Sequence, residues 1–266
     1  KKKKINLYGT YRYKKSLKNF NLRKLKKNVK FYNCNLSQFK KIKYLIKHTK
    51  PDIIFHLASD ADVLKSFRKP FEIISNNNNL TLNLLEVARL LKFNGKIVIC
   101  SSSEVYGNVK KKNQPITEDN KIDPINPYAV SKTFQDLLSQ NYNKIFGLKI
   151  VITRMFTYLN ARRDTLFASA FAKQLLLMKN KNSKLYHGNL SSKRSILDIR
   201  DAMEAYWLAG TKGRIGEIYN ICGKEILTVE ILLKKMIKLL KVNPRLVLSK
   251  SLQRPRDINL QISNCK

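Results

Sequence analysis

The sequence predicts an α/β fold, in which a doubly wound parallel sheet is joined to a smaller C-terminal lobe. Apolar runs alternate with longer stretches of helical periodicity, as in strand–helix–strand units. The runs are almost continuously apolar, which is typical of strands covered on both faces. They lie at 5–10, 29–36, 52–59, 96–100, 148–154 and 216–221. Helices are expected at 38–49, 81–89, 133–145, 167–178 and 202–209, the last capped by Asp201.

The composition indicates a folded protein with an extreme positive charge. Hydrophobic residues make up 43% of the 266 residues, which argues against general disorder. Lys and Arg number 53 against 18 Asp and Glu, a net charge of +35. Such a charge is typical of nucleic-acid or anionic-membrane surfaces. Here the lysines are spread along the chain, and no run approaches the ~20 apolar residues of a membrane span, so we expect neither partner.

The four cysteines are Cys34, Cys100, Cys222 and Cys265, and they are scattered without metal-type spacing. We therefore expect free thiols in a reducing compartment, no metal site and a cytoplasmic location. No cleavable leader is expected either, because the lysine run at 1–4 is not followed by an apolar segment.

Two short motifs carry candidate chemistry. The first, Ser-Ser-Ser-Glu-Val-Tyr-Gly at 101–107, directly follows the strand-like run at 96–100. The second places Tyr128 and Lys132 four residues apart, on one face of a helix. A lysine ammonium beside a phenol lowers the tyrosine pKa from about 10. We therefore expect Tyr128 to exchange a proton with a substrate hydroxyl near neutral pH, assisted by a serine of the first motif.

Tyr-x-x-x-Lys alone is a weak signal, because lysine-rich helices contain such pairs by chance. In this order, the two motifs resemble the extended short-chain dehydrogenases/reductases, the NAD(P)-dependent nucleotide-sugar epimerases and dehydratases. The resemblance implies that Ser102, Glu104, Tyr128 and Lys132 are catalytic. Tyr128 would draw the proton from the sugar O4, Ser102 would hydrogen-bond O4, and Lys132 would hold the nicotinamide ribose. Glu104 would act as base and acid when water is removed across C5–C6.

The resemblance also implies cofactor contacts in the first half of the chain. Arg12 matches an arginine that accommodates the 2′-phosphate of NADP, so we expect NADP, with NAD as the alternative. The competing interpretation of Arg12 is one more surface cation. Asn35 replaces an aspartate that bonds the adenine amino group, and its amide oxygen can still accept a hydrogen bond. Leu57 and Ala58 end a strand that packs against the cofactor, and Asn77 matches an asparagine of the following helix.

Relatives carry a first strand, a glycine-rich phosphate loop and a helix ahead of the first strand present here. None of the nine glycines forms G-x-G-x-x-G or a near variant. We therefore expect a chain that lacks both ends of the family's fold and binds the cofactor poorly. The expected domains are a Rossmann-like NAD(P)-binding domain at 1–152, without its first strand and loop, and a mainly substrate-binding lobe at 153–266, interleaved with the sheet.

Basic residues in the second half match the family's nucleotide-sugar site. Arg162 and Arg163 precede a predicted helix, and arginine suits a diphosphate because its fork bonds two oxygens at once. Asn189 and Arg194 lie in a Gly-Asn-Leu…Arg…Asp-x-Arg-Asp pattern typical of GDP-mannose 4,6-dehydratases and their partner reductases. By resemblance, Arg254 in Arg-Pro-Arg-Asp would clamp the diphosphate.

These matches predict NADP-dependent modification of a GDP-linked sugar, with GDP-mannose 4,6-dehydratase as the first hypothesis. Glu104 favours the dehydratase, because typical UDP-galactose epimerases lack it. Reductases that act on the dehydratase product share Ser-Ser-Glu-Val-Tyr-Gly, so such a reductase or another epimerase is the alternative. A hypothesis of another class is a non-catalytic NADP- or RNA-binding relative, supported only by the charge. By analogy with relatives, we expect a homodimer or homotetramer.

Overall fold

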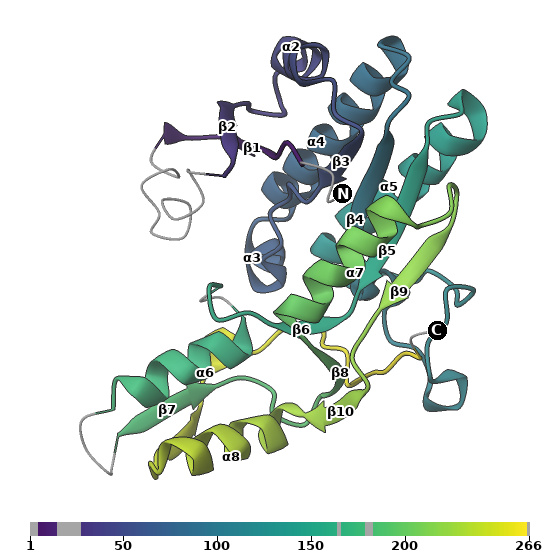
Figure 1. Ribbon diagram of the computed structural model, residues 1–266. Coiled ribbons are helices and arrows are strands. Elements are labelled where there is room, and N and C mark those ends of the chain that lie inside the picture. Colours follow the sequence, from purple (N-terminus) through teal and green to yellow (C-terminus); the bar gives the residue numbers. More distant parts are fainter. Residues whose placement is uncertain (1–4, 15–27, 164–165, 179–182, 265–266) are drawn as a thin grey trace.

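The computed structural model describes residues 5–14, 28–163, 166–178 and 183–264. Its central feature is a four-stranded parallel sheet (Figure 1). The strands follow the order β3 (Ile53–His56), β4 (Lys96–Ser102), β5 (Ile150–Met155) and β9 (Ile218–Ile221). A separate parallel pair consists of β1 (Tyr8–Tyr11) and β2 (Lys30–Asn33). The predicted Rossmann-like α/β fold is confirmed.

Helices cover both faces of the four-stranded sheet, because successive side chains of a strand point to opposite sides. On β4, Ile97 and Ile99 enter one core, whereas Val98 enters the other. Helices α2, α4 and α5 supply the first core and α7 supplies the second, and a short α3 follows β3. The bounds of these helices are Phe39–Thr49 (α2), Val63–Arg68 (α3), Pro70–Leu90 (α4), Pro127–Phe146 (α5) and Ile199–Thr211 (α7).

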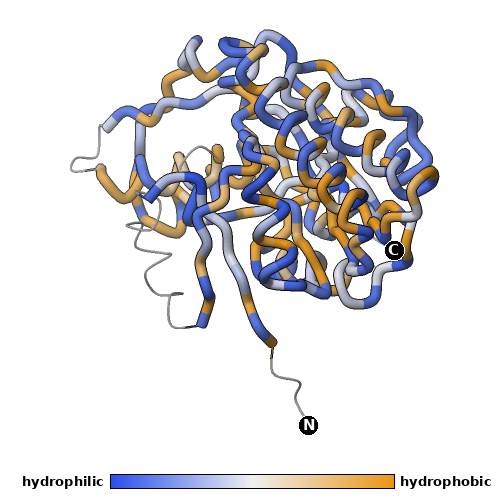
Figure 2. The backbone as a smooth tube through the Cα atoms, turned by 90° about the horizontal axis from the view of Figure 1, so that it is seen from above, coloured by the Kyte–Doolittle hydropathy of each residue, from blue (hydrophilic) through white to orange (hydrophobic). Residues whose placement is uncertain are grey.

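Helix α5 begins and ends on strong local signals, and this fixes where its side chains point. Asn126 caps the N-terminus, accepting a hydrogen bond from the backbone N–H of Ala129 at 2.8 Å, and Pro127 occupies the first turn. Gly147 ends the helix with φ of 67°, in the left-handed region that favours glycine. Hydrophobic and hydrophilic positions alternate along the helices of the molecule (Figure 2), as expected when one face packs on a sheet.

A smaller assembly lies beyond the carboxyl end of β5 and contains two minor sheets. One joins β6 (Thr157–Leu159), β8 (Lys193–Asp198), β10 (Glu225–Thr228) and β12 (Leu260–Gln261), and the other pairs β7 (Lys184–His187) with β11 (Arg245–Leu248). Helices α6 (Phe167–Leu176) and α8 (Val229–Leu240) pack beside them (Figure 1). Their core contains Phe171, Leu175, Leu185, Val229 and Leu233.

Short 3₁₀ turns complete the described chain, at Ser103–Tyr106 (η2), Lys111–Asn113 (η3) and Lys250–Leu252 (η4). In the described residues, no helix combines the length and the apolar character needed to cross a membrane. The same part of the chain contains no cluster of three or more His, Cys, Asp or Glu able to hold a metal ion.

Two sequence-based expectations are wrong. Helix α7 begins at Ile199, and its N-cap is Asp198, which accepts a hydrogen bond from the backbone N–H of Arg200. Asp201 therefore lies in the first turn, where a carboxylate favours the positive end of the helix dipole. Cys222 is disulfide-bonded and not a free thiol, whereas Cys34 and Cys100 are free. Cys265 lies outside the described residues.

Candidate active site

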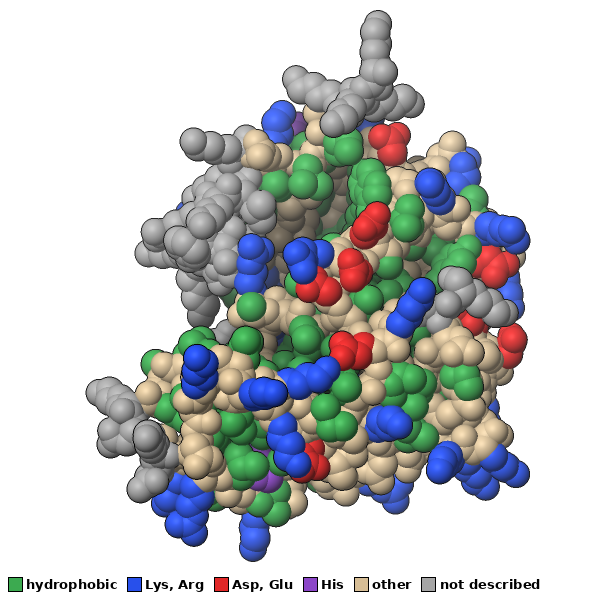
Figure 3. Space-filling view, turned by 60° about the horizontal axis from the view of Figure 1, so that its bottom comes forward, with side chains coloured by type: hydrophobic (Ala, Val, Ile, Leu, Met, Phe, Trp, Pro, Cys, Tyr) green, Lys and Arg blue, Asp and Glu red, His purple; other side chains and the backbone are tan. Residues whose placement is uncertain are grey.

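A cavity of about 1400 Å³ opens between the carboxyl ends of the parallel strands and the smaller assembly. This is where open α/β sheets bind ligands, because loops from several strands converge there. Space-filling Figure 3 shows this face hollowed, with acidic and basic side chains close to the hollow. The predicted residues that line the cavity are Arg12, Leu57, Ala58, Ser102, Glu104, Tyr128, Lys132, Arg163, Asn189, Arg194 and Arg254. Asn35, Asn77 and Arg162 are absent from its lining.

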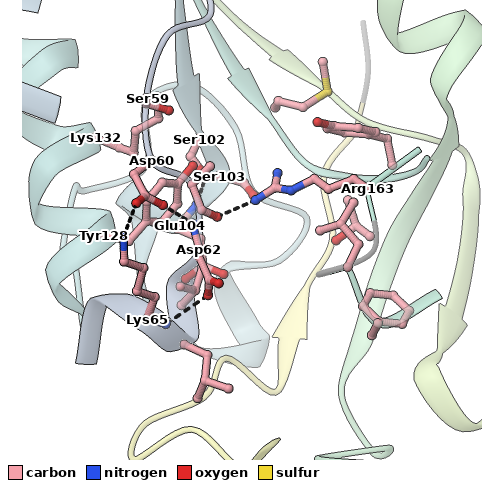
Figure 4. A pocket seen from close by; sticks show the side chains of 18 of the residues that line it. Ser59, Asp60, Asp62, Lys65, Ser102, Ser103, Glu104, Tyr128, Lys132 and Arg163 are labelled. Atoms are coloured by element: carbon pink, nitrogen blue, oxygen red, sulfur yellow. Dashed lines mark hydrogen bonds and ion pairs between the residues drawn. The ribbon is translucent and has the colours of Figure 1, made fainter. Parts of the chain in front are cut away.

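Strand β4 delivers the first motif to the cavity. Ser102 is its last residue, and the Ser102 hydroxyl accepts a hydrogen bond from the backbone N–H of Glu104 at 3.2 Å, which starts the η2 turn. The turn directs Glu104 into the cavity next to Ser102 and Tyr128 (Figure 4). Asn126 donates to Glu104 Oε2 at 2.8 Å, and Arg254 Nη1 lies 3.5 Å from Oε1. The carboxylate therefore has one close partner, Asn126, and one more distant partner, Arg254.

Helix α5 delivers Tyr128 and Lys132, which are 8% and 2% exposed. The Tyr128 pKa is raised, mainly because burial disfavours the phenolate, and a hydrogen bond with Ser102 only partly opposes this. Burial also lowers the pKa of Lys132, whose ammonium donates to the carbonyl of Cys100 and to Gln135 Oε1. Lys132 is not among the groups that shift the Tyr128 pKa in this structure, so the predicted lowering of that pKa by Lys132 is not seen and burial raises it instead.

Behind Lys132, a buried polar network ties α5 to α4. Gln135 accepts from Lys132 and donates to the carbonyl of Asn77 and to Thr81 Oγ1. His56 Nε2 lies 2.8 Å from the same Thr81 hydroxyl. Burial, and secondarily the charge of Lys132, lowers the His56 pKa to about 3. His56 is thus a neutral packing residue at the end of β3.

The expected cofactor residues divide into two groups. Arg12 lines the cavity and donates to Asn76 Oδ1 at 3.2 Å, while Leu57 and Ala58 line it at the end of β3. Asn77 is fully buried and donates to Ser131 Oγ at 2.9 Å. Asn77 therefore affects the cavity indirectly: its amide oxygen accepts a hydrogen bond at 2.7 Å from the backbone N–H of Asp60, on the β3–α3 loop that lines the cavity.

Asn35 lies outside the cavity in this structure. Its Oδ1 accepts a hydrogen bond from the backbone N–H of Ser37 at 3.1 Å, which forms an Asx turn. Its proposed contact with adenine stays a prediction.

The rim near α3 holds charged side chains that sequence reasoning missed. Lys65 Nζ lies 2.6 Å from Asp60 Oδ2 and 2.7 Å from Glu72 Oε1, and these hydrogen bonds raise the Lys65 pKa. Across the cavity, Arg163 donates to the carbonyl of Ala61 at 2.7 Å (Figure 4). Arg163 therefore connects the loop after β6 to the loop after β3, instead of standing free for a substrate.

Two of the predicted substrate arginines meet around an aspartate that the sequence did not single out. Asp257 Oδ1 lies 3.2 Å from Arg254 Nη1 and 3.7 Å from Arg194 Nη2, and Asn189 donates to Asp257 Oδ2 at 3.0 Å. Arg194 is largely buried, and burial lowers its pKa despite the nearby carboxylates. The Arg-Pro-Arg-Asp pattern contains Asp257, but only the fold reveals that it joins residues from two distant segments.

A buried ion pair supports the site from beneath. Arg154 on β5 contacts both oxygens of Asp136 on α5, at 2.9 and 3.1 Å, and the two side chains are 3% and 0% exposed. Arg154 also donates to the hydroxyl of Tyr106, the last residue of η2, at 2.9 Å. Ser101 donates to Asp136 at 2.8 Å. One ion pair therefore fixes β4, β5, α5 and the turn that carries Glu104.

The geometry agrees with comparisons with known proteins. A family model described as GDP-mannose 4,6 dehydratase matches residues 2–259. The chain belongs to this family. GDP-6-deoxy-D-mannose reductase of Pseudomonas aeruginosa is 30% identical over 200 residues, which make up 74% of this chain and 66% of the reductase. The chain thus spans just under two thirds of that relative, and about half or less of some others.

Solved structures of similar fold include further nucleotide-sugar enzymes. UDP-glucuronic acid 4-epimerase from Bacillus cereus, in complex with UDP-glucuronic acid and NAD, has a TM-score of 0.85 at 25% identity, with 98% of this chain and 82% of that chain covered. RMD from Pseudomonas aeruginosa, complexed with NADPH, has a TM-score of 0.82 at 23% identity, with 98% and 90% covered. The family thus comprises relatives that are dehydratases, epimerases and reductases.

Proposed function

We propose that this member of the family is an NADP-dependent GDP-mannose 4,6-dehydratase, which converts GDP-mannose to GDP-4-keto-6-deoxymannose and water. The observation that carries the proposal is the position of Glu104. Its carboxylate faces the cavity beside Ser102 and Tyr128, held by Asn126 on one oxygen. Elimination of water across C5–C6 needs a group that first takes the C5 proton and then protonates the departing C6 hydroxyl, and one carboxyl group can do both.

The other side chains would orient the sugar and move the O4 proton. Ser102 would hydrogen-bond the sugar O4 beside Tyr128, and Tyr128 would take the O4 proton while C4 is oxidised. Because burial raises the Tyr128 pKa, the phenol is neutral before ligands bind. A proton-acceptor role therefore requires additional positive charge beside the phenol.

Residues of the cavity fit two parts of NADP, the nicotinamide ribose and the 2′-phosphate. Tyr128 and Lys132 lie at the floor of the cavity, where they would hold the nicotinamide ribose, and Arg12 would meet a 2′-phosphate. The cofactor, when bound, supplies hydride transfer. The cofactor diphosphate is not assigned to any residue within 1–266, which contain no glycine-rich phosphate loop. NADP is favoured over NAD by Arg12, and the similar RMD structure contains NADPH.

The second candidate is a GDP-4-keto-6-deoxymannose reductase. Two observations favour it: a relative of that activity is 30% identical to the chain, and a neutral Tyr128 suits a proton donor to the sugar O4. Another nucleotide-sugar epimerase remains the third alternative. A non-catalytic NADP- or RNA-binding role is disfavoured, because a pure binding module has no need of Ser102, Glu104, Tyr128 and Lys132 in one cavity.

We also propose a homodimer or homotetramer in the cytoplasm, with the domain boundary at 152/153. Support for self-association comes from α5, whose Val130, Leu137 and Ile145 are 43%, 51% and 65% exposed. Apolar side chains on one exposed helix favour burial against another protein surface. The second lobe is interleaved with the first, because two elements that follow residue 153 return to the central sheet: β9 is one of its strands, and α7 packs on its face.

Mass spectrometry tests the activity. The protein is incubated with GDP-mannose and NADP⁺, and the sugar nucleotide is followed over time. We expect loss of one water, abolished by Glu104→Gln, which keeps the shape of the side chain and removes the base. An unchanged mass would contradict the dehydratase. Addition of two hydrogens to the 4-keto product, with NADPH as reductant, would instead establish the reductase.

A further inference from the structure

Glu104 has a contact that its proposed role as acid and base does not require. Its Oε1 lies 3.5 Å from Nη1 of Arg254, the arginine expected to clamp the substrate diphosphate. Two arginines, Arg194 and Arg254, here meet two carboxylates, Glu104 and Asp257. The formal charges of this four-residue cluster therefore cancel in the protein alone.

The two carboxylates are held differently. Asp257 has two arginine contacts, a hydrogen bond from Asn189 and one from the backbone N–H of Ile258. Among the described residues, Glu104 has the single 3.5 Å ion pair with Arg254 on one oxygen and Asn126 on the other. Asp257 is thus a fixed anchor of the arginines, and Glu104 is the partner that can be exchanged.

We propose that Glu104 occupies the arginine pair as a counter-anion, and that an incoming diphosphate displaces it. This inference rests on the proposed function insofar as the site takes a nucleoside diphosphate. Arg254, 31% exposed in its side chain, would turn its guanidinium to the diphosphate, because charge-assisted bonds to two phosphate oxygens are stronger than one long ion pair.

Displacement would prepare Glu104 for chemistry. Asn126 keeps its 2.8 Å bond to Oε2, so the carboxylate stays beside Tyr128 while Oε1 loses its cation. An oxygen released from an arginine is a stronger proton acceptor, because the opposite charge that stabilised the anion has gone. Occupation of the diphosphate site would therefore activate the base only when a nucleotide sugar is present.

Displacement of Glu104 should lower the affinity of the wild-type protein for the diphosphate. Glu104 competes for Arg254 and repels the negative diphosphate, so the wild-type protein binds more weakly than a variant with a neutral side chain. The expected gain is roughly tenfold in affinity, because the net effect of one long, partly exposed ion pair is much smaller than the unscreened interaction of two unit charges. A residue that merely contacted the ligand favourably would have the opposite effect when changed.

The test measures GDP and inorganic pyrophosphate binding by calorimetry, without sugar or turnover. Glu104→Gln is compared with the wild type, and Glu104→Ala serves as a second variant, with folding checked by circular dichroism. The matched control is Glu72→Gln, which removes one carboxylate from the same cavity, where Glu72 pairs with Lys65 and not with the arginines. The Glu104→Gln gain is also measured in an Arg254→Gln background.

We expect Glu104→Gln and Glu104→Ala to bind GDP about tenfold more tightly, Glu72→Gln to match the wild type, and the gain to shrink without Arg254. Unchanged or weaker binding by both Glu104 variants would overturn the inference. So would an equal gain in Glu72→Gln, or wild-type protein that binds neither GDP nor pyrophosphate. If the gain is present but GDP-mannose is not converted, the inference stands and the dehydratase proposal fails.

Discussion

Substitution of Arg154 is expected to lower the unfolding free energy by several kcal/mol, because it breaks the buried ion pair with Asp136. In Arg154→Met, both oxygens of Asp136 lose their guanidinium donors, and the carboxylate stays buried at 0% exposure with only hydroxyl and amide partners. An uncompensated buried charge costs about 3–5 kcal/mol. Tyr106 loses a donor as well, so η2 and Glu104 are released together.

The size of the effect follows from the environment of the pair. Burial is the largest single influence and lowers the Arg154 pKa, but the hydrogen bonds and charges of Asp136 and Tyr106 together outweigh it and raise the pKa. The pair is therefore mutually dependent, and each single change should cost several kcal/mol of unfolding free energy. In the double variant Arg154→Met/Asp136→Leu no charge is left behind, and we expect a loss of only ~1–2 kcal/mol. The loss would come mainly from the Ser101 hydroxyl, which loses its acceptor, and from the hydrogen bonds that Arg154 donates to Tyr106 and to the carbonyl of Glu118.

Equilibrium urea unfolding, followed by circular dichroism, measures these differences for the wild type, both single variants and the double variant. Turnover is measured in parallel, because release of η2 should lower kcat even where the protein remains folded. The reasoning is refuted if the double variant loses the sum of the two single losses. Additive losses would mean that the two side chains stabilise the fold independently of each other.

Three further predictions concern pH, backbone and cofactor. His56 has a pKa of about 3 in the fold against ~6.5 when unfolded, so the stability that its neutral form contributes is complete above pH ~6.5 and is lost as pH falls below that value. The unfolding free energy should therefore fall by about 2 kcal/mol between pH 7 and pH 5. A pH dependence of the same size in His56→Asn would contradict this. Gly107 (φ 61°, ψ −139°) and Gly147 (φ 67°, ψ 16°) both have positive φ, but only Gly147 is in the left-handed helical region, and a Cβ would meet the carbonyl of Asp123 only at Gly107. Gly107→Ala should therefore cost ~2–3 kcal/mol and Gly147→Ala ~1 kcal/mol in urea unfolding, and equal losses would argue against crowding. Residues 1–266 contain no glycine-rich loop, so a polypeptide of these residues alone should bind NADPH poorly in a fluorescence titration; micromolar binding would reject this.

Local patterns in the sequence determined most of the fold and the chemistry at its centre. Apolar runs predicted β3, β4, β5 and β9, because strands buried on both faces leave an uninterrupted apolar signal. Spacing of four placed Tyr128 and Lys132 on one helical face, and both line the cavity. These features depend on neighbours in the chain, so one sequence is sufficient to infer them.

Only the tertiary structure decided the electrostatics of the site. The sequence suggested that Lys132 lowers the Tyr128 pKa, but burial raises it, and the lysine is held by Gln135 and a backbone carbonyl. The Asp136–Arg154 pair and the Glu104–Arg254 contact join segments that no local pattern connects. Charge interactions depend on distance and burial in space, and both quantities exist only after the chain has folded.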